Sequence, residues 1–350
     1  VFIHGLIRDS EGKKMSKFNG NILDPLDLIY GIDFDLLLKK RYLNTLKEDK
    51  VVRIKIYNDT KKQFLLGIPS FGVDVLRFSF FSLATEHLFL RFDSSKVMCF
   101  KLFCNKLWNV SRYIFLFTCN FDVVQVPKVF AYLEQWVLYK WSVVKVSVFF
   151  NYLPTYRLSC LSTTLYDFVM NEFCFWYIVF IKVNIFDFSS NYVFSKTRQY
   201  CLLLIFEEIV KCLHPIIPFI TEEIWQRFPF FYKKGCQSIM QSRYQMQFFD
   251  TDIGRKIFDA KACMVVDLLK KFVYKIRSFR NLQRIKNSCI LILYPSVLSY
   301  VKSVDWFLLY KDLLFSICNT VIMSHFIAFL VNGRNEIFFD ENLMFIVFER

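Results

Sequence analysis

The sequence predicts a multidomain chain in which an α/β segment is followed by an α-helical bundle and a small mixed α/β tail. Residues 1–95 begin with a short apolar run, a polar loop and a helix-start signal. Residues 96–285 carry the periodicity of long helices, and residues 286–350 break into short apolar runs separated by turn signals such as Asn332-Gly333. The 350 residues are enough for about two domains of ordinary size.

The N-terminal segment is expected to run from a strand at Val1–Ile3 through a basic loop at residues 8–21 into a helix. Asp24-Pro25 supplies a helix N-cap followed by proline at the first helical position. Residues 35–66 alternate charged and apolar runs, which indicates a small solvated insertion. Helical periodicity then resumes over Gly72–Phe81.

The central region is expected to be mainly helical. The predicted helices lie near residues 97–118, 126–141, 163–183, 196–228 and 255–281. The stretch 142–161 is poorly periodic and is interpreted as a connection. The tail contains short apolar runs such as Ile290–Tyr294 and Met344–Phe348, which favour a mixed α/β structure.

Composition excludes several classes of protein. Lys and Arg number 45 against 31 Asp and Glu, a net charge of +14, and 55% hydrophobic residues rule out wholesale disorder. The 43 Phe residues are interpreted as the codon bias of an AT-rich genome. The 11 Cys residues form no Cys-x-x-Cys pair and no Cys/His cluster, so we expect reduced thiols and no bound metal in this segment.

A mean hydropathy of +0.32 raises the alternative of a membrane protein. The best candidate spans, Phe168–Phe186 and Trp306–Val331, are interrupted by charged and amide side chains. Buried helices of a soluble bundle are therefore the preferred interpretation, with no membrane as a partner.

The strongest local signal is Lys14-Met15-Ser16-Lys17. Two lysines three residues apart on a loop before a helix N-terminus can bind the triphosphate of ATP and stabilise the charge that develops as pyrophosphate leaves. A lysine-rich loop alone is more often a solvated surface. The order of strand, loop, Gly20-Asn21, Asp24-Pro25 and helix gives the motif its weight.

With His4–Asp9 before it and Gly20–Pro25 after it, this loop resembles the Lys-Met-Ser-Lys-Ser loop of the class I aminoacyl-tRNA synthetases. Gly67–Phe78, which follows a basic insertion, resembles the valyl members of that family. Further similarities lie at Phe103–Asn109, Leu213–Trp225 and Ile276–Asn281. The resemblance implies the C-terminal edge of a class I Rossmann-type α/β catalytic domain followed by an anticodon-binding helical bundle.

The resemblance also implies an aminoacyl-tRNA ligase that activates valine with ATP and transfers it to tRNA(Val). Lys14 and Lys17 are then the catalytic residues, and Ser16 joins them in binding ATP, which brings its Mg²⁺. Contacts to the tRNA backbone are expected from six basic residues: Lys39, Lys40, Arg41, Arg277, Arg280 and Arg284. The expected state is a cytoplasmic monomer.

The sequence departs from the family pattern at Phe18, where the family has Ser or Thr, and it lacks the family's His-x-Gly-His motif. Because the chain begins with Val1 rather than Met, we interpret it as part of a longer chain and expect the segment alone to be inactive. A non-catalytic tRNA-binding module, or a remnant of a synthetase in a reduced genome, remains the alternative. Asp74 and Arg77 are expected to form a structural pair at a helix start, and His214 to be satisfied by the backbone.

Overall fold

The computed structural model describes residues 5–16, 20–43, 50–84, 89–118, 130–185, 192–227, 237–244, 260–282, 289–293, 317, 320–324, 336–340 and 343–349. The chain forms two compact units. Unit 1 comprises Val1–Asp122, Trp141–Met170 and Leu202–Phe248, and unit 2 comprises Val123–Lys140, Asn171–Cys201 and Phe249–Arg350. The domain ranges 1–95, 96–285 and 286–350 remain predictions.

Unit 1 opens with a strand pair that frames the basic loop. Strand β1 (Leu6–Arg8) pairs in parallel with β2 (Phe89–Arg91), with Ile7 opposite Leu90. The predicted strand at Val1–Ile3 lies outside the described residues. Parallel strands need a long crossover, and here the described residues of the crossover form four helices.

The first of these helices, α1 (Pro25–Tyr30), begins as predicted. The Asp24 side chain accepts a hydrogen bond from the backbone N–H of Leu26 at 3.0 Å, and Pro25 occupies the first turn. Asp24 and Asp27 both accept hydrogen bonds from Lys40, so the helix start is also tied to the next helix along the chain.

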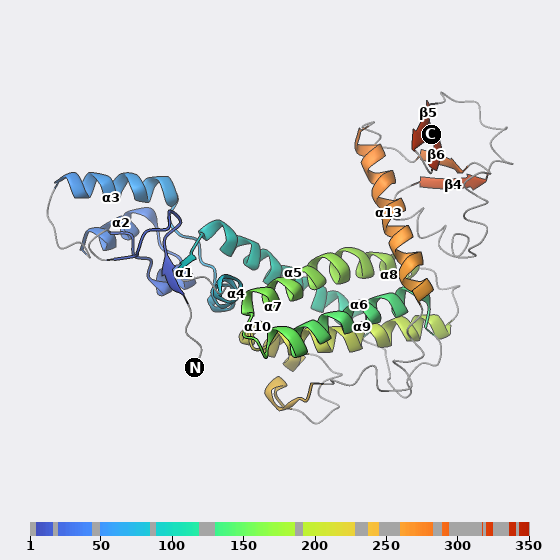
Figure 1. Ribbon diagram of the computed structural model, residues 1–350, viewed down its shortest axis with the longest axis horizontal. Coiled ribbons are helices and arrows are strands. Elements are labelled where there is room, and N and C mark those ends of the chain that lie inside the picture. Colours follow the sequence, from blue (N-terminus) through green and yellow to red (C-terminus); the bar gives the residue numbers. More distant parts are fainter. Residues whose placement is uncertain are drawn as a thin grey trace. The chain divides into compact units, whose positions relative to one another are not determined.

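The predicted insertion is a helical hairpin, with α2 (Phe34–Leu43) packed beside α3 (Lys50–Gln63) (Figure 1). Its base is closed by two backbone hydrogen bonds between Ile32 and Ile68. Gly67 has a φ of +82°, and a Cβ there would lie 2.3 Å from the carbonyl oxygen of Ile32. Only glycine fits this closing position.

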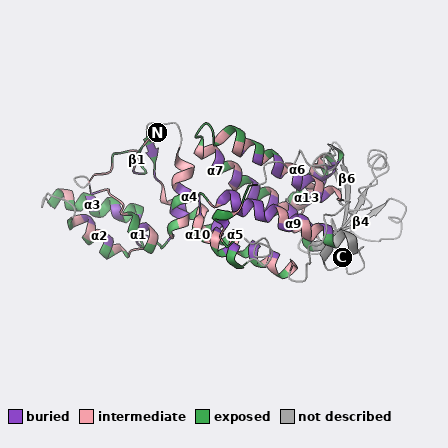
Figure 2. Ribbon diagram, turned by 90° about the horizontal axis from the view of Figure 1, so that it is seen from below, coloured by how far each residue is buried: buried purple, intermediate pink, exposed green. Residues whose placement is uncertain are grey.

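The core of unit 1 is helical and rich in aromatic residues. Helix α4 (Val73–Leu83) packs against α5 (Ser94–Thr118) and α7 (Leu158–Asp167), and α10 (Pro218–Arg227) packs against α4 and α5. Phe78 is fully buried, with its ring 4.6 Å from that of Phe100 and 5.0 Å from that of Phe103. Figure 2 shows the buried residues concentrated in these helices, whereas α2 and α3 carry many exposed ones.

Two sequence predictions about helix boundaries were wrong. The stretch 142–161 was expected to be a connection, but α6 (Tyr132–Val146) continues through it into a π-helix, η1 (Ser147–Tyr152), before a short turn leads to α7. The predicted helix 196–228 is two helices, α9 (Tyr192–Leu213) and α10, because the Pro215–Pro218 turn breaks it.

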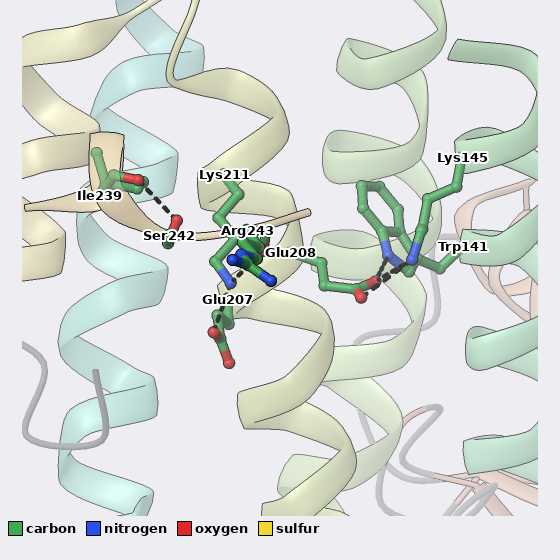
Figure 3. Close-up of polar contacts among 8 residues, drawn as sticks. All are labelled: Trp141, Lys145, Glu207, Glu208, Lys211, Ile239, Ser242 and Arg243. Carbon is green, nitrogen blue, oxygen red and sulfur yellow. Dashed lines mark hydrogen bonds and ion pairs between the residues drawn. The ribbon is translucent and has the colours of Figure 1, made fainter. Parts of the chain in front are cut away.

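Charged side chains are buried within the helices of unit 1 (Figure 3). Glu208 on α9 accepts hydrogen bonds from Lys145 at 3.0 and 3.1 Å and from the indole of Trp141. One helical turn away, Lys211 pairs with Glu207 at 2.8 Å and donates to the carbonyl oxygen of Arg243. These lysines carry paired charges inside an apolar core.

Unit 2 contains the remaining helical segments and a sheet. Its helices include η2 (Phe168–Tyr177, of π type), which begins in unit 1, then α8 (Ile178–Ile185) and α13 (Ala260–Leu282). The four strands are β3 (Cys289–Leu293), β4 (Thr320–Ser324), β5 (Glu336–Asp340) and β6 (Leu343–Glu349). Their order is β4-β3-β6-β5, with β3 parallel to β4 and antiparallel to β6.

Within the described residues, one stretch, Leu158–Lys182, is long and apolar enough to cross a membrane. Half of its most apolar window is buried inside the protein. By length and composition alone this is weak evidence for a membrane span.

Candidate functional site

The base of the basic loop is organised by one buried carboxylate. Asp9 is 8% exposed, and its Oδ1 accepts hydrogen bonds from the backbone N–H groups of Glu11 at 3.1 Å and Lys13 at 2.7 Å. Its Oδ2 accepts from Nδ2 of Asn21 at 2.8 Å. Asp9 therefore joins the two ends of the loop, since it directly follows β1 and Asn21 precedes α1.

Asn21 fixes the backbone of the same loop at Lys14 and Ser16. Its Nδ2 also donates to the carbonyl oxygen of Lys14 at 3.2 Å, and its Oδ1 accepts from the backbone N–H of Ser16 at 3.0 Å. The backbone around the motif is thus fixed by side chains outside the motif.

The turn within the loop is held by Arg8. Its guanidinium donates to the carbonyl oxygen of Gly12 at 3.0 Å and lies 3.5 Å from the centre of the Phe89 ring. Gly12 has a φ of +82°, which a side chain would strain. The neighbouring Lys13 pairs with Glu11 at 2.6 Å on the exposed surface, and Glu11 raises the pKa of Lys13.

The motif residues differ in how far the structure describes them. Lys14 is exposed, and within the described residues its ammonium group makes no hydrogen bond or ion pair. Ser16 is half-buried. Lys17 and Phe18 lie outside the described residues. The Lys14 side chain is therefore exposed to solvent, while Asp9 and Asn21 fix the backbone of the loop by hydrogen bonds.

The basic run after α1 separates into three different environments. Lys39 is exposed. Lys40 bridges Asp24 and Asp27 at 2.6 and 2.8 Å, which raises the pKa of Lys40 and lowers that of Asp24.

Arg41 is only 4% exposed and donates to Oγ1 of Thr60 at 2.8 Å between α2 and α3. Burial lowers the pKa of its guanidinium. The predicted contact of Arg41 with tRNA does not fit this geometry, because a buried guanidinium cannot reach a nucleic-acid backbone.

The predicted basic contacts in α13 are partly described. Arg277 and Arg280 are half-exposed, and the Arg277 guanidinium lies 5.9 Å from the centre of the Phe175 ring in unit 2. Arg284 lies outside the described residues.

Asp74 and Arg77 were expected to pair with each other at the start of α4. Instead, both reach across to the turn between α9 and α10. Asp74 accepts from the backbone N–H groups at the start of α10, and Arg77 donates to two carbonyl oxygens of the turn. His214 is satisfied by a side chain, since its Nδ1 lies 2.8 Å from Oγ1 of Thr221.

Asp9, Asn21 and Arg8 lie in the segments that resemble the family, but no role was predicted for them from the sequence. The available signal was Asp9-Ser-Glu-Gly, a turn pattern in which an Asp side chain binds backbone N–H groups two and four residues later. Within the described residues, no group of three His, Cys, Asp or Glu side chains could hold a metal ion.

Comparisons with known proteins place both parts of the chain. Residues 1–89 match the family described as "tRNA synthetases class I (I, L, M and V)". Residues 134–289 match the family described as "Anticodon-binding domain of tRNA ligase". A non-catalytic module is not favoured, because the N-terminal match is to synthetases.

Relatives with similar sequences are valine–tRNA ligases. Those of Legionella pneumophila (strain Paris) and Buchnera aphidicola (subsp. Acyrthosiphon pisum) are 38% and 37% identical over 296 residues, 84% of this chain and 31% and 30% of theirs. The Coxiella burnetii ligase is 36% identical over 80% of this chain and 30% of its own length. The chain thus spans about a third of the length of the curated relatives it matches.

Among solved structures, a ternary complex of LeuRS with tRNA and LeuAMS from Agrobacterium radiobacter covers 83% of this chain and 26% of its own, with 12% identity and a TM-score of 0.43. That likeness is too weak to bear on fold or function. The sequence matches are decisive without it. The chain belongs to the class I tRNA synthetase family, and the relatives named above are valine–tRNA ligases within it.

Proposed function

We propose that the protein carrying this chain is a valine–tRNA ligase. In its first step the valine carboxylate attacks the α-phosphorus of ATP, forming valyl-adenylate and releasing pyrophosphate. In the second step a terminal ribose hydroxyl of tRNA(Val) attacks the valyl carbonyl, and AMP leaves. The names of the relatives support this assignment, and the chain alone spans too little of them to contain the whole reaction.

The loop is proposed to act on the pyrophosphate side of ATP. One observation carries this: Asp9 and Asn21 fix the loop backbone, while the Lys14 ammonium is exposed and makes no ion pair with any described residue. A cation held on a fixed backbone can meet a phosphate without first breaking an internal pair. Lys17 and Ser16 are proposed to complete the contact, and Mg²⁺ is proposed to arrive with ATP.

The test uses the full-length protein and three alanine variants. Lys14→Ala and Lys17→Ala are each expected to lower valine-dependent ATP–pyrophosphate exchange by about 100-fold, the usual cost of one lost transition-state contact, while tRNA binding stays nearly unchanged. Lys13→Ala is the matched control, because Lys13 neighbours the motif but is paired with Glu11. An equal loss in Lys13→Ala would show that the exchange depends only on the loop's total charge.

The helical region is proposed to hold the anticodon arm of tRNA(Val). Arg277, Arg280 and Arg284 are the proposed backbone contacts there. Lys39 is a proposed contact to the inner corner of the tRNA, and Lys40 joins it only by leaving its pairs with Asp24 and Asp27. Replacing one phosphate-binding lysine or arginine reduces the slope of log K against log salt by about one. Binding of tRNA(Val) at several salt concentrations therefore measures each contact, and equal affinity for isoleucine tRNA would overturn the valine assignment. We further propose a cytoplasmic monomer that needs no membrane.

A further inference from the structure

The segment Ser70–Arg77 joins two helix ends in unit 1. On one side, the backbone N–H groups of Phe71 and Gly72 donate to the last carbonyl oxygens of α1, those of Leu28 at 3.0 Å and Ile29 at 3.1 Å. The final carbonyl groups of a helix have no partner within the helix, so these bonds cap α1. Because α1 starts four residues after Asn21, the cap also ties Ser70–Arg77 to the basic loop.

On the other side, Asp74 caps the start of α10. Its Oδ2 accepts from the backbone N–H of Ile220 at 2.7 Å and its Oδ1 from that of Phe219 at 3.3 Å. A carboxylate at a helix start satisfies unpaired N–H groups and interacts favourably with the helix dipole. Asp74 thus serves as a capping residue for a helix more than 140 residues further along the chain.

Arg77, one turn further along α4, holds the turn that leads into α10. Its Nε donates to the carbonyl oxygen of Ile216 and its Nη2 to that of Pro215, both at 3.0 Å. The planar guanidinium can make two such bonds at once, which fixes direction as well as distance. Together the two side chains hold Pro215–Ile220 with four hydrogen bonds.

These four bonds join the two parts of the chain that match different families. Asp74 and Arg77 lie in residues 1–89, and Pro215–Ile220 lies in residues 134–289. Apolar packing of α4 against α5 and α7 already supplies buried area there, but apolar contacts have little directional preference. Hydrogen bonds do have one, so Asp74 and Arg77 are the groups that set the register.

We propose that Asp74 and Arg77 are positioning residues that keep the α9–α10 turn in register with α1 and the basic loop. By this inference, which rests on the proposed function, tRNA held by the helical region is aligned with the loop through Ser70–Arg77. Losing the alignment impairs the step that uses tRNA and spares the step that uses only valine and ATP. A merely structural pair would impair both steps together.

The test measures both steps in the full-length protein. Asp74→Asn and Arg77→Met are expected to leave ATP–pyrophosphate exchange within about twofold and to lower kcat/KM for aminoacylation of tRNA(Val) by about tenfold or more, in the range of ordinary coupling between sites. Arg77→Lys keeps the positive charge but at most part of the paired hydrogen bonds. Its kcat/KM for aminoacylation is therefore expected to lie between those of the wild type and Arg77→Met. The double variant is expected to lose less than the product of the single losses, because the two residues hold the same turn.

Two exposed residues provide matched controls. Arg112→Met on α5 and Asp35→Asn on α2 remove the same groups from exposed side chains that make no hydrogen bond or ion pair with the described residues, and both are expected to aminoacylate normally. Thermal unfolding of each variant identifies any that fail to fold. Equal losses in exchange and aminoacylation, or no loss at all, would overturn the inference. A wild-type protein that does not charge tRNA(Val) would instead overturn the proposed function.

Discussion

Two regions of unit 1 use lysine in opposite ways. In the basic loop, Lys14 is exposed and makes no ion pair with any described residue, while Asp9 and Asn21 bind only the backbone around it. In the helical core, Lys145 and Lys211 are buried, and each is paired with a glutamate of α9. In the loop, polar side chains form hydrogen bonds that fix the backbone. In the core, the glutamates neutralise the charges of buried lysines.

The difference shows what decides the use of a basic residue. A buried ammonium group loses its hydration and needs a carboxylate partner. Its charge is therefore neutralised inside the protein and is not available to a ligand. An exposed ammonium on a fixed backbone keeps its charge available for an anionic ligand. Burial and partner, rather than residue type, therefore separate candidate functional lysines from structural ones.

The largest expected effect comes from breaking a buried pair. Glu208→Ala removes the carboxylate to which the Lys145 ammonium and the Trp141 indole donate, and removing one partner of a buried pair destabilises a protein by about 3–5 kcal/mol. Urea unfolding followed by circular dichroism measures the loss. Glu11→Ala, which breaks the exposed pair with Lys13, is expected to change stability far less, because water and salt screen an exposed pair. Comparable losses in the two variants would contradict the distinction between buried and exposed pairs.

The next effect concerns the loop. Asp9→Ala removes the acceptor for two backbone N–H groups and for Asn21, so the loop backbone loses its anchor at both ends. Misplacing a catalytic group by about 1 Å can cost roughly 100-fold in rate, and we expect a loss of that order in ATP–pyrophosphate exchange. Hydrogen exchange of residues 8–16 is expected to rise in parallel. Full exchange activity in Asp9→Ala would show that the loop does not need this anchor.

A smaller effect is expected to distinguish Arg41 from Lys39 in the basic run. Arg41→Met removes a buried hydrogen bond to Thr60, and hydrogen bonds of charged groups contribute about 1.5–3 kcal/mol. Its free energy of unfolding is expected to fall by that amount, with tRNA affinity of the folded protein unchanged. Lys39→Met is expected to do the reverse, keeping stability and weakening tRNA binding at low salt. Unfolding and filter binding of both variants test the contrast, and a tRNA defect in folded Arg41→Met would refute it.

Local chemistry was predictable from the sequence, and long-range pairing was not. The Asp24-Pro25 helix start depends on neighbours in the chain, and it was confirmed. The burial of Arg41 depends on Thr60, which lies 19 residues away in a second helix. The partners of Asp74 lie farther still. The sequence Lys39-Lys40-Arg41 alone therefore does not show which of the three charged groups is exposed to water.

The helix errors have a similar cause. Aromatic and β-branched residues make up nearly half of 142–161, and no regular polar face marks a helical period there. The structure stays helical to Tyr152 with Val148 buried, whereas Val146 and Phe150 are exposed, so the apolar residues of this stretch do not mark its buried face. The single helix predicted over 196–228 ends at Leu213, and Asp74 and Arg77 supply polar partners for the turn and the helix start that follow.

The smallest effect extends the comparison to a titratable ring whose hydrogen-bond partner is a hydroxyl group instead of a carboxylate. His214 is part-buried beside Thr221, and burial lowers its pKa although Glu222 and Asp74 oppose the shift. The native state then prefers the neutral ring. Above the unfolded pKa of about 6.5 both states are neutral, and as pH falls below it the unfolded state binds the proton first, so stability is lost. Urea unfolding at pH 7.5 and 5.5 should therefore show a larger loss in the wild type than in His214→Asn. Equal losses would mean that the protonated ring is tolerated at this turn.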